Sequence, residues 1–85
     1  MPYSVEFTEA ARKAFLRLPA GVKAKIGSSI DSLGSNPRPR GCKKLRGEES
    51  MYHVRVGDYR NVYEIRDRVL LVLILRIGHR REVYR

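Results

Sequence analysis

The second half of the chain contains three strand-like segments separated by two short turns, and this pattern constrains the fold more than any other feature. Residues 52–56 alternate between apolar and polar side chains, residues 59–65 form the next segment, and residues 69–75 are apolar throughout. Gly57-Asp58 and Arg66-Asp67 lie between these segments, and such residues favour tight turns. The pattern predicts a three-stranded antiparallel meander. We expect its apolar last strand to be central and covered on both faces.

The first half of the chain predicts one further strand and a helical hairpin. Residues 3–7 alternate as in a half-buried strand, and Thr8 can cap the helix that follows. Pro19 interrupts this helix, and a second helix carries an apolar stripe made of Val22, Ile26, Ile30 and Leu33. The hairpin has one apolar face and needs a sheet to cover. We therefore expect an α+β fold, with a single domain over residues 1–85 whose helices cover one small sheet.

Several function classes are disfavoured by what the sequence lacks. The longest apolar run has the length of a strand, and the N-terminus shows no cationic and apolar secretion signal, so we expect a cytoplasmic protein. Cys42 has no second cysteine for an internal disulfide. The two histidines have no carboxylates near them at ligand spacing, so we expect neither a metal nor a cofactor. Gly-rich phosphate loops, nucleophile elbows and redox motifs are also missing from the sequence.

The charge of the chain points to an anionic partner. Eighteen Lys and Arg residues against nine Asp and Glu residues give a formal charge of +9. From Arg38 onward there are thirteen basic and six acidic residues, so this stretch carries +7 of the +9. Residues 38–50 are predicted to form an irregular basic loop that attracts RNA over a distance. Arginine dominates the second half, and its planar fork suits phosphate.

A smaller group of residues could carry out chemistry on RNA. Strand parity places His53 and Arg55 on the polar face of their strand, and Arg60 begins the next one. The last strand is expected to deliver further cations at its end, with a tyrosine beyond them. RNA supplies its own 2′-hydroxyl nucleophile, so a protein needs to provide a base, charge stabilisation and geometry. The candidates for catalysis are His53, Arg55, Arg60, Arg80 and Tyr84, and those for RNA contact are Lys43, Lys44, Arg46, His79 and Arg81.

Five segments in order resemble the RelE branch of the RelE/ParE toxins. They are the start Tyr3-Ser4-Val5-Glu6-Phe7-Thr8, residues 44–47 (KLRG), 52–60 (YHVRVGDYR), 62–65 (VYEI) and 77–84 (IGHRREVY). The resemblance covers essentially the whole chain. It implies a ribosome-dependent, metal-free mRNA endonuclease that enters the ribosomal A site and belongs to a prokaryotic type II toxin–antitoxin pair. Its partners would be mRNA, the ribosome and a RelB-like antitoxin, with no membrane involved.

The resemblance also implies roles for individual residues. Arg60 and Arg80 match arginines around the scissile phosphate, Tyr84 matches the C-terminal tyrosine that positions the substrate, and Lys44 and Arg46 match a basic loop that contacts RNA. The sequence departs from the best-known members at two positions. His53 and Arg55 stand where those members carry lysines, and arginine is a poor base because it stays protonated. Our hypothesis is that His53 is the general base.

Two alternatives remain open at the level of sequence. The first is a ParE-like inhibitor of DNA gyrase on the same fold, although that branch typically lacks the set formed by Arg60, Arg80 and Tyr84. The second is an RNA-binding member of the fold without catalysis, because a lost base would leave binding intact. In each case an acidic antitoxin is the expected partner, since a surface with a charge of +9 is best blocked by carboxylates.

Overall fold

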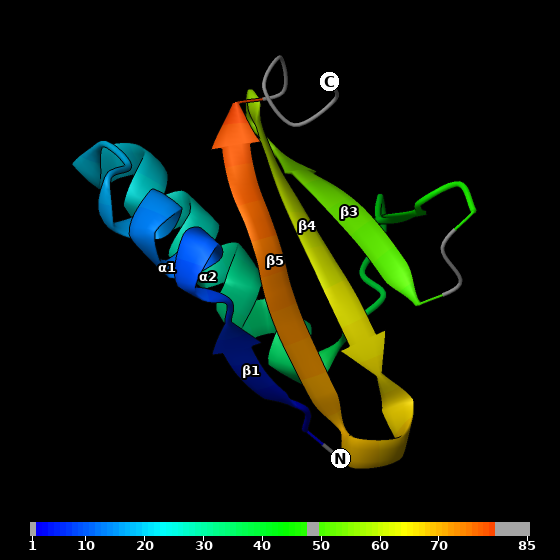
Figure 1. Ribbon diagram of the computed structural model, residues 1–85. Coiled ribbons are helices and arrows are strands. Elements are labelled where there is room, and N and C mark those ends of the chain that lie inside the picture. Colours follow the sequence, from blue (N-terminus) through cyan, green and yellow to red (C-terminus); the bar gives the residue numbers. More distant parts are fainter. Residues whose placement is uncertain (1, 48–49, 80–85) are drawn as a thin grey trace.

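Within residues 2–47 and 50–79, which the computed structural model describes, the chain forms five strands, two helices and one 3₁₀ turn (Figure 1). In chain order these are β1 (Ser4–Phe7), α1 (Glu9–Leu16), α2 (Ala20–Ser35), β2 (Lys43–Lys44), β3 (Met51–Val56), β4 (Tyr59–Arg66), the turn η1 (Asp67–Val69) and β5 (Leu71–His79). The strands make one sheet in the order β1-β5-β4-β3-β2. The predicted α+β fold is confirmed.

The predicted meander forms the middle of the sheet. β3 pairs with β4 and β4 pairs with β5, both antiparallel. β1 adds a parallel strand on the far side of β5, with Ser4 opposite Leu71 and Phe7 opposite Ile74. The helical hairpin connects β1 at one edge of the sheet to β2 at the other edge. Figure 1 shows β1 and β5 side by side, with the helices near them.

Local sequence accounts for where the helices begin and end. The Thr8 hydroxyl accepts a hydrogen bond from the backbone N–H of Ala11 at 3.1 Å, as expected of a cap. The same hydroxyl donates to the carbonyl oxygen of Leu75 at 3.1 Å, which fastens the start of α1 to β5. Pro19 precedes the first residue of α2, where its missing N–H costs nothing. No described helix is both long and apolar enough to cross a membrane.

The core lies between the helices and one face of the sheet. The apolar stripe of α2 is buried from Ile26 to Leu33, as predicted, and Ala11 of α1 joins it. Its sheet partners are Val54, Tyr63, Ile65, Val72, Ile74 and Ile77. The alternation of buried and half-buried residues along β4 and β5 shows that the helices close only this face. We call the opposite side of the sheet the open face.

The prediction for the last strand was wrong in three respects. Val69 belongs to the 3₁₀ turn and is 67% exposed, and Leu70 has a left-handed backbone with φ 52°, so β5 begins only at Leu71. The strand is also not covered on both faces, since Leu71 and Leu73 are only half-buried on the open face. β4 rather than β5 is the central strand. An apolar run reports hydrophobicity, and it does not distinguish a turn from a strand.

The predicted irregular loop is more ordered than expected at its start and in its middle. Lys43 and Lys44 form the short strand β2, antiparallel to β3. Arg38 donates to both carboxylate oxygens of Asp67, and its guanidinium lies 5.3 Å from the ring centre of Tyr52. These contacts hold the pKa of Arg38 above its ordinary value and that of Asp67 below it. Arg38 therefore fastens the loop to the β4–β5 turn instead of serving only as a solvated charge.

Candidate nucleic-acid interface

Strand parity gathers cations on the open face of the sheet. Tyr52, Val54 and Val56 alternate along β3 and pack on the core. His53 and Arg55 therefore lie on the other side, as predicted. On β4 the buried positions are Asn61, Tyr63 and Ile65, which places Arg60 and Val62 on the open face. Cross-strand partners lie on one face, and the register pairs Arg55 with Arg60 and His53 with Val62. β2 adds Lys43 opposite His53.

A bulge in β5 brings one further arginine to this face. Val62 pairs with Arg76, but the next residue, Tyr63, pairs with Ile74, so Leu75 is an extra residue on β5. Beyond the bulge the parity is reversed: Ile74 and Ile77, three positions apart, are both buried, and Arg76 between them is exposed. We call Lys43, His53, Arg55, Arg60 and Arg76 the cationic cluster.

Sequence reasoning missed Arg76, although the sequence contains a signal for it. A charged residue, Arg76, interrupts the apolar strand directly before Ile77. If side chains simply alternated from the inward-facing Ile74, the next inward side chain would be that of Arg76. A cation cannot be buried there without a partner, so the strand has to shift by one residue. The spacing therefore indicates a bulge. It can be recognised from sequence only when the helix-facing positions are already known.

The burial and the charges of the cluster change the pKa of His53. Partial burial of the imidazole lowers its pKa below the ordinary value of 6.5, and the charges of Arg60 and Lys43 lower it further. Both causes act on the protonated form, which loses hydration and is repelled by the two cations. The imidazole is therefore neutral at neutral pH. A neutral histidine can accept a proton, which is the first requirement for a general base.

The two arginines at the β3–β4 end have different surroundings. The Nε of Arg55 donates to the carbonyl oxygen of Gly57 at 2.8 Å, and Arg55 is exposed. Gly57 has φ +62°, a conformation that glycine adopts without strain in this tight turn. Arg60 is half-buried and acts on the charge of His53. Arg60 is therefore the arginine of this pair whose charge acts on the candidate base, while Arg55 is directed toward the turn.

The predicted RNA-contact residues divide between several places. Lys43 belongs to the cluster, and Lys44 pairs with Tyr52, so the two lysines face opposite sides of the β2–β3 ribbon. Arg46 is exposed after Leu45, whose backbone N–H donates to the carbonyl oxygen of Met51. Arg80, Arg81 and Tyr84 lie outside the described residues, so their roles stay predictions.

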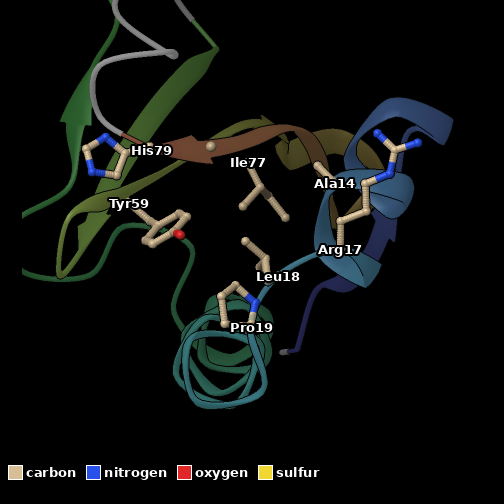
Figure 2. Close-up of a pocket in the computed structure, with 8 residues that line it drawn as sticks. Ala14, Arg17, Leu18, Pro19, Tyr59, Ile77 and His79 are labelled. Atoms are coloured by element: carbon tan, nitrogen blue, oxygen red, sulfur yellow. The ribbon is translucent and has the colours of Figure 1, made fainter.

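His79 lies on the helix side of the sheet, away from the cluster. It pairs with Tyr59, and the two rings meet edge to face with their centres 5.7 Å apart. Both residues line a cavity of about 280 Å³. Figure 2 shows the two rings together with Leu18, Pro19 and Ile77, which also line it. The cavity is thus formed by the α1–α2 connection and the ends of β4 and β5. The structure does not bring His79 together with His53 and Arg60, and its predicted RNA contact stays a prediction.

One buried polar residue stands out on the helix-facing side. Asn61 is 0% exposed, and among the described residues neither its side-chain oxygen nor its nitrogen has a hydrogen-bond partner. Its cross-strand neighbours are Val54 and Ile77, which are both apolar. An unsatisfied buried amide destabilises a fold by about 1–3 kcal/mol. Asn61 directly follows Arg60, so this buried amide lies in the core next to a residue of the cationic cluster.

Metal ligands do not gather in the part of the chain that the structure describes. In residues 2–47 and 50–79, no three His, Cys, Asp or Glu side chains come close enough together to hold a metal ion. The cationic cluster on the open face offers guanidinium, ammonium and imidazole groups. Such groups bind phosphate, and the imidazole can exchange a proton near neutral pH.

The fold, a five-stranded sheet with a helical hairpin on one face, is that of solved RelE toxin structures. Residues 5–84 match the family described as "ParE toxin of type II toxin-antitoxin system, parDE". The chain belongs to this RelE/ParE toxin superfamily, and its similarities place it among the RelE-like members.

The individual similarities cover nearly the whole chain. It is 38% identical to Toxin RelG of Mycobacterium tuberculosis, over 100% of this chain and 99% of that protein. It is 30% identical to the mRNA interferase toxin RelE of Escherichia coli, over 99% of this chain and 92% of that protein. The toxin–antitoxin complex RelBE2 of M. tuberculosis contains a similar chain, with a TM-score of 0.80, 35% identity and coverage of 93% of this chain and 99% of that one.

Proposed function

We propose that this protein is the toxin of a type II toxin–antitoxin pair and that it cuts mRNA in the ribosomal A site, without a metal, by attack of the RNA's own 2′-hydroxyl. The observation that carries the proposal is the cationic cluster with a neutral imidazole among its charges. The similarity to an mRNA interferase toxin supports the same activity.

In the proposed reaction His53 removes the proton from the 2′-hydroxyl. The oxygen then forms a bond to the adjacent phosphorus, and the bond from phosphorus to the 5′-oxygen of the next nucleotide breaks. A proton donor completes the 5′-hydroxyl, and the other product is a 2′,3′-cyclic phosphate. We assign the stabilisation of the phosphate charge to Arg60 and Arg80, and substrate positioning to Tyr84. Arg55 contributes positive charge but does not act as a base, because arginine stays protonated.

The depressed pKa of His53 suits this reaction in the free protein. Below the pKa the imidazole is charged and cannot accept a proton, so a lower value keeps the base available at neutral pH. Bound RNA adds negative charge and raises the pKa again, which stabilises the imidazolium once it has taken the proton. The cations that surround the base and the anion that binds there therefore have opposite effects on its proton affinity.

An acidic antitoxin is the proposed partner. A formal charge of +9 favours a chain rich in carboxylates, and a segment that blocks RNA has to cover the open face. The similar chain in the M. tuberculosis RelBE2 complex is bound to its antitoxin. We expect the acidic product of a neighbouring gene to raise the melting temperature of the protein on mixing. An unchanged melting temperature would count against this pairing.

A gyrase inhibitor is the second candidate, because the matched family carries the description of ParE. Toeprinting on ribosomes that translate a defined mRNA separates the two functions. Cuts within the A-site codon are expected for the nuclease. Intact mRNA together with trapped gyrase–DNA complexes would establish the alternative, and tight ribosome binding without cuts would identify a non-catalytic RNA-binding member.

A further inference from the structure

The β5 bulge aligns four cross-strand neighbours on the open face. Lys43, His53, Val62 and Arg76 follow one another from β2 to β5. Neighbouring strands lie about 4.8 Å apart, so the backbone positions of His53 and Arg76 are about 10 Å apart. Val62 lies between them as an apolar surface. The row therefore has cations at both ends and a half-buried apolar side chain inside it.

Arg76 differs in its surroundings from three other described arginines. Arg12, Arg38 and Arg66 each form an ion pair with a carboxylate. Arg76 has no such pair among residues 2–47 and 50–79, and it is exposed within an apolar strand. The nearest carboxylate along the open face of β4 is that of Glu64, which is bound to Arg66 at 3.0 Å.

Like charges at close range destabilise the fold unless an anion lies between them. Arg60 pairs with Gly78, two residues after Arg76, and glycine places no side chain between the two guanidiniums on this face. The charge of Arg60 reaches the imidazole of His53, whereas Arg76 is not among the groups that shift the pKa of His53. Arg76 is therefore part of the cluster but lies beyond the immediate surroundings of the candidate base.

We propose that Arg76 binds a phosphate next to the one that is cut, and so forms a second phosphate subsite that sets the register of the RNA over Val62. This subsite rests on the proposed ribonuclease function. The guanidinium fork binds phosphate oxygens in a bidentate manner, which orients the strand as well as attracting it. The reacting phosphate then lies with Arg60 and His53, one step along the strand.

The test uses ribosomes programmed with an mRNA whose A-site codon carries 2′-deoxy nucleotides, which cannot supply the attacking hydroxyl. Binding of the wild type, Arg76→Ala, Arg76→Lys and Arg68→Ala is measured over a range of salt concentrations. Arg68 is the matched control, because it is an exposed arginine at the opposite end of the same β4–β5 hairpin. Cleavage of the matching all-ribose mRNA is measured in single turnovers with saturating protein.

We expect Arg76→Ala to weaken binding about tenfold. The negative slope of log affinity against log salt should become shallower by about 0.7, since one phosphate contact is lost. The saturated cleavage rate should stay within about twofold of wild type. Arg76→Lys should recover the slope but only part of the affinity, since an ammonium lacks the fork. Arg68→Ala should bind more tightly than Arg76→Ala. Equal urea midpoints of the variants exclude a loss of fold.

Two results would overturn the subsite while the ribonuclease function stands. One is Arg76→Ala with wild-type affinity and salt slope. The other is Arg76→Ala with wild-type affinity but a large loss of saturated rate, which would place Arg76 at the reacting phosphate. A wild type that neither binds nor cuts on programmed ribosomes overturns the proposed function, and the subsite fails with it.

Discussion

The two faces of the sheet are built from the same strands, yet they carry opposite chemistry. On the helix-facing side Tyr63, Val72 and Ile74 are fully buried. On the open face the neighbouring positions carry the cationic cluster and half-buried apolar residues. Because successive residues of a strand alternate between faces, stability and binding are assigned to alternate positions. A substitution on the helix-facing side should therefore change the stability of the fold with little effect on RNA binding. A substitution on the open face should change RNA binding with little effect on stability.

The largest effect on folding is expected from the helix-facing side of β5. Ile74→Ala removes a fully buried side chain, and the lost burial and the cavity should lower the free energy of unfolding by about 2–5 kcal/mol. Urea denaturation followed by circular dichroism measures the change. Leu73→Ala on the same strand is the matched control, because Leu73 is half-buried on the open face. Its replacement should lower the free energy of unfolding clearly less than that of Ile74. Equal losses would mean that the two faces of β5 are equally covered.

Asn61 is the exception on the helix-facing side, and its replacement should stabilise the protein. Asn61→Leu keeps a similar size and removes an amide without a hydrogen-bond partner, so we expect a gain of about 1–3 kcal/mol in the free energy of unfolding. The urea midpoint should rise, while ribosome binding stays unchanged, because Asn61 does not reach the open face. A lower midpoint would show that the amide is satisfied in solution, for example by an internal water.

The smallest effect on folding is expected at the loop anchor, where charge and not burial is responsible. Arg38 and Tyr3 hydrogen-bond the carboxylate of Asp67, and they lower its pKa below the ordinary value of 3.8. A depressed folded-state pKa contributes stability above the unfolded-state value, and this contribution is lost as the pH falls through the folded-state value. Asp67→Asn should therefore have a slightly lower urea midpoint than the wild type at pH 7. The difference between the two midpoints should be smaller near pH 3. A constant difference between the two proteins would contradict this account.

Patterns within one segment were predictable from the sequence, whereas contacts between distant segments were not. The Thr8 cap, the α2 stripe and the shared face of His53 and Arg55 follow from local spacing, and each is confirmed. The parallel pairing of β1 with β5 joins residues that are far apart in the chain. The ion pair between Arg38 and Asp67 does the same. No local periodicity reports such partners.

The candidate site shows the same division. Parity identified the side of β3 that carries His53, but the contribution of β5 depended on a bulge that reverses parity in mid-strand. Arg76 was therefore missed. His79 was expected near the other cations, and the same bulge is why it lies on the helix side beside Tyr59. A one-residue shift thus decides which basic residues of β5 lie on the open face.

The proposal depends most directly on His53 acting as the base. The decisive measurement is kcat/KM for cleavage of A-site mRNA as a function of pH, for the wild type and His53→Ala, with Arg68→Ala as a surface control. The wild-type profile should fall on the acid side with a midpoint below 6.5, because burial and the charges of Arg60 and Lys43 lower the pKa of the free imidazole. His53→Ala should be slower by about 10²–10⁴-fold and should lack this acid limb. A His53→Ala variant that keeps the wild-type rate and the acid limb would contradict the account.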